Sequence, residues 1–165
     1  GIGTAIEVSF DLKAAGSEKE IRDVEEFKKK RLECIQEKKI VLIAEDECDN
    51  REVLKTYLEE LGFAVDTAIS GEEVVDMFME SEPGLYKAIF MDIEMPGING
   101  YQATMMIRGM NRADNDIMII AMTANAFRDY KEEAMNSGMN YYLTKPLRME
   151  RLSNFLNEID SLHPF

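Results

Sequence analysis

The fold is decided by residues 90–100, which read Phe90-Met91-Asp92-Ile93-Glu94-Met95-Pro96-Gly97-Ile98-Asn99-Gly100. The apolar run 88–91 leads into Asp92, and the proline and glycines that follow prevent a strand from continuing. Asp92 is therefore predicted at the carboxyl end of a buried strand, the edge at which ligands bind in open α/β sheets. An isolated aspartate here would more simply cap the next helix, so its functional interpretation depends on residues elsewhere.

Three other short apolar runs also end in polar residues. Residues 40–44 precede Glu45-Asp46, residues 117–122 precede Thr123, and residues 141–143 precede Thr144-Lys145-Pro146. The runs are too short for helices and are rich in β-branched or aromatic residues, which is typical of strands. A parallel sheet would bring all four strand ends to one edge, where they offer acids, a hydroxyl and an amine. This combination indicates a site that handles a phosphoryl group.

Strands and helices alternate from residue 40 onward. The strands are predicted at residues 40–44, 63–68, 86–91, 117–122 and 141–143. The helices are predicted at residues 48–61, from 71 to just before Pro83, 101–110, 126–137 and 148–160. Alternation with short loops predicts an α/β fold, a doubly wound five-stranded parallel sheet with five helices distributed over both faces.

Four motifs, in this order and spacing, resemble the signature of response-regulator receiver domains: Glu45-Asp46, Met91-Asp92-Ile93-Glu94-Met95-Pro96, Met122-Thr123-Ala124 and Lys145-Pro146. The match extends over roughly residues 39 to 160. Three sequence segments further resemble those of the receivers of hybrid sensor histidine kinases: Ala44-Glu45-Asp46, Ala121-Met122-Thr123-Ala124-Asn125-Ala126 and Gly138-Met139-Asn140. The resemblance implies a flavodoxin-like sheet with strand order 2-1-3-4-5.

The resemblance also implies a phosphoacceptor and a metal site. Asp92 would accept the phosphoryl group, and neighbouring acids would hold a hard divalent cation with oxygen ligands, Mg²⁺, because close carboxylates otherwise repel one another. The expected ligands are Asp46 and Asp92 together with the backbone carbonyl of Glu94. Glu45 is expected to act through water, because many receivers carry the shorter aspartate at this position.

The remaining site residues take their roles from the same resemblance. Thr123 and Lys145 would assist Asp92 in catalysis by binding oxygens of the phosphoryl group. Thr123 and Tyr142 would form the switch that reports phosphorylation to an output surface. Pro146 would follow a cis peptide bond that positions Lys145. Without the resemblance, Tyr142 could equally be an ordinary half-buried strand aromatic.

The charge is distributed unevenly along the 165 residues. The formal net charge is −13, and residues 1–39 hold nine Lys/Arg and nine Asp/Glu, whereas residues 40–165 hold ten and twenty-three. Such an acidic domain should repel nucleic acid and anionic lipid, so the expected partners are proteins and a cation. The two cysteines and single histidine lack the spacing of a zinc site. Without a long apolar run or signal peptide, we expect a cytoplasmic domain with no direct membrane contact.

The segment before the sheet is predicted to contain two elements. Alternating apolar residues in 1–15 predict a strand that resembles the last strand of a histidine kinase ATP-binding domain. Its exposed edge could pair with a second copy in a weak homodimer. Residues 16–38 are predicted to form a linker helix that opens with a capping box at Ser17–Glu20, and residues 39–161 the receiver. The chain begins with Gly1, so we expect a piece of a longer protein.

The expected function is two-component signal transduction. Asp92 would take a phosphoryl group from a phosphohistidine of the parent chain's histidine kinase domain and pass it to a histidine phosphotransfer protein, and the receiver would catalyse its own Mg-dependent phosphorylation and dephosphorylation. One alternative is a degenerate receiver that acts only as a protein-docking module. A second is an aspartyl-phosphate hydrolase of the haloacid dehalogenase type, which would require an aspartate where this chain has Glu94.

Overall fold

The structure is a computed structural model that describes residues 22, 25–26, 29, 39–124 and 128–162. The strand predicted within residues 1–15 lies outside the described residues. The linker helix predicted at residues 16–38 lies largely outside them too, and the four residues of that segment that are described are helical and exposed: Arg22, Glu25, Glu26 and Lys29.

Strands and helices alternate from residue 40 to residue 162. The strands are β1 (Ile40–Ala44), β2 (Ala64–Ala68), β3 (Tyr86–Asp92), β4 (Met118–Thr123) and β5 (Tyr141–Thr144). The helices are α2 (Cys48–Glu60), α3 (Gly71–Glu80), α4 (Gly100–Arg108), α5 (Arg128–Ser137) and α6 (Met149–Leu162). All ten elements predicted for this part of the chain are present, with ends that differ from the predictions by at most two residues. Residues 126–127 of the predicted helix 126–137 lie outside the described residues.

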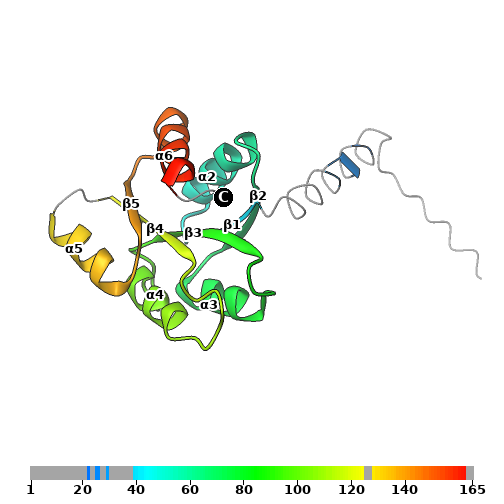
Figure 1. The fold of residues 1–165 in the computed structure, drawn as a ribbon. Helices are drawn as coiled ribbons and strands as arrows, with labels where there is room; N and C mark the ends of the chain where they lie inside the picture. The colour runs from blue at the N-terminus through cyan, green and yellow to red at the C-terminus, as the bar shows by residue number, and fades with distance from the viewer. Residues whose placement is uncertain (1–21, 23–24, 27–28, 30–38, 125–127, 163–165) are drawn as a thin grey trace, which may run out of the picture.

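The five strands form one parallel sheet in the order β2-β1-β3-β4-β5. Helices α2 and α6 cover one face of the sheet, and α3, α4 and α5 cover the other (Figure 1). The predicted doubly wound, flavodoxin-like arrangement and the strand order are therefore confirmed. Since all strands run in one direction, their polar ends meet at one edge of the sheet.

A hydrophobic core lies on each side of the sheet. Successive residues of β3 point to opposite faces, so Phe90 packs in the core under α2 and α6 while Met91 packs under α3, α4 and α5. Both side chains are fully buried, and burial of such a side chain contributes about 1.5–3 kcal/mol. Packing on both faces fixes the position of β3, and thereby the position of Asp92 at its end.

The structure also bears on membrane contact and on the cysteines. Within the described ranges, no helix has both the length and the apolar composition needed to cross a lipid bilayer. Cys48 is a free, exposed thiol, while Cys34 and His163 lie outside the described residues.

Candidate functional site

The first part of the site is the loop between β1 and α2. The amide of Glu45 donates to the carbonyl of Ala68 at 3.1 Å, so the hydrogen bonding between β1 and β2 continues one residue beyond the end of β1. This places the Glu45 side chain inside, with 2% of its surface exposed. Asp46, one residue further, is exposed. The two acids therefore present one buried and one accessible carboxylate at the same edge.

The second part is the end of β3. Asp92 is the last residue of this strand and is 4% exposed. The next amide, that of Ile93, still donates to the carbonyl of Met122 on β4 at 3.1 Å. The amide of Glu94 turns back and donates to Asp92 Oδ1 at 3.3 Å, and the Glu94 side chain is exposed. Asp92 is thus held by the sheet on one side and by the following loop on the other.

The three acids converge. Carboxylate oxygens of Glu45, Asp46 and Asp92 all lie within 4.8 Å of one another. Burial raises the pKa of Glu45, and the nearby charge of Asp92 raises it further, against the opposing effect of Lys145. Three carboxylates so close repel one another unless a cation lies between them, and an all-oxygen donor set suits a hard divalent ion. The residues present therefore fit the predicted metal.

Lys145 reaches the same point from β5. Its Nζ lies 2.6 Å from Glu45 Oε2 and 3.0 Å from Asp92 Oδ2. Burial opposes the ammonium charge, but the hydrogen bonds to the two carboxylates outweigh it, and the pKa of Lys145 is raised. The amide of Lys145 donates to the carbonyl of Thr123 at 2.8 Å, which ties the base of the lysine to β4. The Lys145–Pro146 bond is cis, the isomer that the family resemblance implied.

Thr123 and Tyr142 lie on neighbouring strands. Thr123, the last residue of β4, is 2% exposed. Tyr142 pairs with Ala121 of β4, and because side chains alternate along a strand, Thr123 and Tyr142 share the face covered by α5. Tyr142 is half-buried, and the Nζ of Lys131 lies 4.8 Å from its ring centroid.

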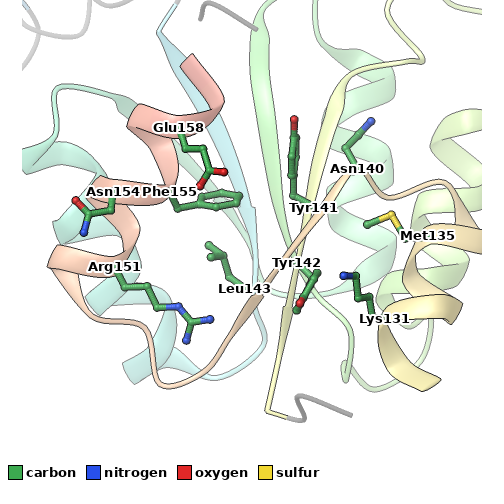
Figure 2. A pocket seen from close by; sticks show the side chains of 10 residues that line it. All are labelled: Lys131, Met135, Asn140, Tyr141, Tyr142, Leu143, Arg151, Asn154, Phe155 and Glu158. Atoms are coloured by element: carbon green, nitrogen blue, oxygen red, sulfur yellow. The ribbon is translucent and has the colours of Figure 1, made fainter. Parts of the chain in front are cut away.

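A hollow of about 560 Å³ follows β5 between α5 and α6. Figure 2 shows Tyr142 and Lys131 on the α5 side of the strand and Phe155 and Arg151 on the α6 side. Tyr141 meets Phe155 edge-on, with ring centroids 5.7 Å apart. The predicted switch aromatic therefore lines an accessible hollow that is separate from the acidic cluster.

Two residues in the first turn of α2, which were not predicted from the sequence, contact the acidic loop. Asn50 Nδ2 lies 3.4 Å from Glu45 Oε1 and 2.5 Å from Glu47 Oε2. Arg51 Nη1 donates to the backbone carbonyls of Glu45 and Asp46, at 2.7 and 3.2 Å. Their position four to six residues after the acid pair, at the start of a helix, was the only signal in the sequence.

The loop between β3 and α4 is held from two directions. Asn99 and Gln102 form a capping box, in which Asn99 Oδ1 accepts from the Gln102 amide at 3.0 Å and Gln102 Oε1 accepts from the Asn99 amide at 3.1 Å. From α3, Glu72 Oε1 accepts from the amide of Ile98 at 3.0 Å. Hydrogen bonds from its own amide and from that of Ile98 lower the pKa of Glu72. The loop that carries Glu94 is therefore fixed from both neighbouring helices.

The fold and the site together define a doubly wound α/β domain with an acidic, lysine-bearing site at the carboxyl edge of its sheet. The family model described as the response regulator receiver domain matches residues 41–157. The chain belongs to this family. Its predicted resemblance to receiver domains is thus confirmed, and it is a receiver domain of two-component signalling.

Two curated relatives are histidine kinases. The chain is 40% identical over 127 residues to the peroxide stress-activated histidine kinase mak2 of Schizosaccharomyces pombe, a match that covers 75% of this chain and 6% of the relative. It is 38% identical over 120 residues to hybrid signal transduction histidine kinase I of Dictyostelium discoideum, covering 71% of this chain and 7% of the relative. The chain therefore spans only a small part of the length of these relatives.

Two solved structures show similar domains. One is the receiver domain of the sensor histidine kinase PA1611 from Pseudomonas aeruginosa PAO1, with a magnesium ion coordinated in the active site cleft; it is 33% identical, with a TM-score of 0.65, covering 73% of this chain and 95% of that one. The other contains the Saccharomyces cerevisiae histidine phosphotransfer protein Ypd1 and the receiver domain of Ssk1. The match is 29% identical, with a TM-score of 0.66, and covers 76% of this chain and 91% of that one.

Proposed function

We propose that Asp92 accepts a phosphoryl group from a phosphohistidine and passes it to the histidine of a phosphotransfer protein. One observation carries this proposal: the Asp92 carboxylate lies within 4.8 Å of those of Glu45 and Asp46 and 3.0 Å from the ammonium of Lys145. A carboxylate can attack phosphorus when the charge on the incoming group is neutralised. The cluster supplies the attacking carboxylate of Asp92 and the ammonium of Lys145. Its carboxylate oxygens could also bind a metal cation.

The transfer requires one bond to form and one to break at phosphorus. An Asp92 oxygen forms the new O–P bond while the N–P bond of the donor phosphohistidine breaks, and the imidazole keeps the electron pair. In the onward step a histidine nitrogen of the recipient attacks, and the Asp92 carboxylate is restored. Lys145 stabilises a phosphoryl oxygen as a fixed positive charge, and the Thr123 hydroxyl binds another. These assignments make Asp92, Thr123 and Lys145 the catalytic residues.

Mg²⁺ is the proposed cofactor. Asp46, Asp92 and the backbone carbonyl of Glu94 would hold it, with Glu45 acting through water. Lys145 contacts both Glu45 and Asp92, at 2.6 and 3.0 Å. When bound, the ion neutralises charge on the phosphoryl oxygens. The magnesium-bound receiver of PA1611 supports this choice of metal.

The proposed setting is the receiver of a hybrid histidine kinase. The relatives named as histidine kinases support this setting, and the complex of Ypd1 with the Ssk1 receiver supports a histidine phosphotransfer protein as partner. In this proposal residues 1–15 end the kinase ATP-binding domain, residues 16–38 link it to the receiver, and residues 39–161 form the receiver. A cytoplasmic location and a weak homodimer through residues 1–15 stay predictions.

Phosphorylation would be read at the face formed by α5, β5 and α6. In this proposal the Thr123 hydroxyl moves toward the phosphoryl group and Tyr142, on the same face of the sheet, turns inward. The accessible hollow beside Tyr142 supports a change that a partner can detect. Pro146 serves by holding the preceding lysine in its observed direction.

Intact-mass measurement after incubation with acetyl phosphate tests the proposal. We expect the chain to gain one phosphoryl group in the presence of Mg²⁺ and none in its absence, and we expect Asp92→Asn to gain none. The matched control is Asp76→Asn, an exposed aspartate on α3, which should behave as the original chain does. A gain that persists in Asp92→Asn would refute the assignment of the acceptor. A folded chain that neither binds Mg²⁺ nor gains mass would favour the docking-module alternative.

A further inference from the structure

Arg51 binds both peptide groups that flank Asp46. The carbonyl of Glu45 belongs to the peptide group before the Cα of Asp46, and the carbonyl of Asp46 belongs to the one after it. Arg51 Nη1 donates to the first at 2.7 Å and to the second at 3.2 Å. Because each peptide group is planar, a residue has only two free backbone dihedrals. Fixing both planes therefore fixes the direction in which the Asp46 side chain leaves the backbone.

No other group in the described part of the chain orients the Asp46 carboxylate. Asp46 is exposed, and its side chain makes no hydrogen bond or ion pair with the residues that the structure describes. The following residue, Glu47, is the N-cap of α2 but makes no side-chain capping bond. The first helical hydrogen bond, from the Arg51 amide, goes to the Glu47 carbonyl at 3.0 Å, so the two carbonyls that precede it depend on the guanidinium.

We propose that Arg51 is a positioning residue for Mg²⁺, which acts by aiming the Asp46 carboxylate at the cation and touches neither the metal nor the phosphoryl group. This proposal rests on the proposed function of the acidic cluster as a magnesium site. Its geometry is that of an outer-shell partner, which fixes the orientation of a metal ligand. The planar guanidinium suits this task because its N–H groups point in fixed directions, whereas the donors of a lysine ammonium rotate on a flexible stem.

The charge and the geometry of Arg51 predict opposite effects on Mg²⁺. A positive charge next to an acidic cluster repels an incoming cation, so if Arg51 acted only as a charge, its removal would strengthen Mg²⁺ binding. If Arg51 aims a ligand, its removal weakens binding, typically by about 10-fold or more for an outer-shell partner. The sign of the change therefore separates the two roles.

The test is a titration of the full chain with Mg²⁺, followed by the backbone amide resonances in NMR spectra, for four proteins: the original chain, Arg51→Met, Arg51→Lys and Lys55→Met. Lys55 lies one turn further along α2, so Lys55→Met removes the same charge without touching the loop. We expect Arg51→Met to raise the dissociation constant for Mg²⁺ about 10-fold. Arg51→Lys keeps the charge but not the planar fork, so its dissociation constant should lie between those of the original chain and Arg51→Met. Lys55→Met should leave Mg²⁺ binding unchanged or slightly tighter.

A second measurement separates positioning from general damage. At saturating Mg²⁺, the phosphorylation rate of Arg51→Met with acetyl phosphate should return to within about twofold of the original rate, since the ligand is misdirected but not removed. An unchanged or tighter dissociation constant in Arg51→Met would overturn the proposal even if thermal stability fell. If Arg51→Met did not fold, unchanged Mg²⁺ affinity in Arg51→Lys would overturn it equally. Failure of the original chain to bind Mg²⁺ would instead reject the proposed metal site, and this inference with it.

Discussion

Gly100→Ala should damage both the stability of the domain and its site. Gly100 opens α4 and packs against the backbone at the end of β3. A Cβ added there would lie 2.2 Å from the carbonyl oxygen of Asp92, 3.0 Å from the carbonyl carbon of Asp92 and 3.0 Å from the Cα of Ile93. All three atoms are backbone atoms, so no rotamer change can relieve the contact. Either α4 or the peptide of Asp92, the proposed phosphoacceptor, must move.

The size of the effect follows from these distances. An ordinary contact to a Cβ begins near 3.4 Å, so relief requires a shift of about 1 Å. Such a shift weakens the bond from the Gly100 amide to the Ile93 carbonyl, now 3.0 Å. Overpacking costs about 1–3 kcal/mol and the hydrogen bond about 1 kcal/mol, while alanine at a compatible site gains about 0.4–1 kcal/mol. We therefore expect the free energy of unfolding to fall by about 1–3 kcal/mol.

Urea unfolding followed by circular dichroism measures this change, with Gly109→Ala as the matched control. Gly109 lies at the other end of α4 in a right-handed helical conformation, and its added Cβ would meet the Met105 carbonyl oxygen at an ordinary contact distance of 3.4 Å. Gly109→Ala should keep or slightly raise stability. Phosphorylation by acetyl phosphate should be slowed in Gly100→Ala and unchanged in the control. Equal stability of the two variants would refute the reasoning.

Three other side chains give further predictions. A hydrogen bond from the guanidinium of Arg112 lowers the pKa of Asp114. The ionised Asp114 therefore stabilises the fold above its unfolded-state pKa, and this stabilisation is lost as the pH falls through the lower folded-state pKa. Asp114→Asn should thus flatten the acid side of a plot of unfolding free energy against pH. Glu72→Ala should speed hydrogen exchange at the Ile98 amide, because the carboxylate that accepts from it is lost. Lys131→Met should shift the ring resonances of Tyr142 in NMR spectra while lowering stability by no more than about 1 kcal/mol.

The sequence predicted the sheet and the main site residues for one physical reason. Parallel strands buried on both faces read as short apolar runs, and the polar residue that ends each run lies at a known edge of the sheet. Asp92 and Thr123 are therefore both the last residues of their strands in the structure. Glu45, Asp46 and Asp92 converge because β1 and β3 are adjacent in the sheet, a strand order that the family resemblance implied and that alternation alone does not fix.

The sequence could not predict contacts made by long side chains across loops. Glu45 was expected to act on the metal through water, and its contact with the ammonium of Lys145, at 2.6 Å, was not predicted. Arg51 and Glu72 lie in predicted helices, but no role was predicted for either, since their partners are backbone groups of loops. Periodicity identifies which face of a helix is buried, but it carries no information about the rotamer of a side chain at the helix end.

Three arginines show how this acidic domain uses its positive charges. Arg51, Arg108 and Arg112 each donate to two backbone carbonyls, which belong to Glu45 and Asp46, to Asn115 and Gly138, and to Met79 and Ser81 respectively. These carbonyls lie in loops or at helix ends, where the main chain offers few partners. A lysine would keep the net charge but could not present a planar fork to two fixed oxygens. The arginines therefore act through geometry. Arg51 holds the loop that carries Asp46, whereas Arg108 and Arg112 hold segments that precede β3, β4 and β5, at the opposite edge of the sheet from the acidic cluster.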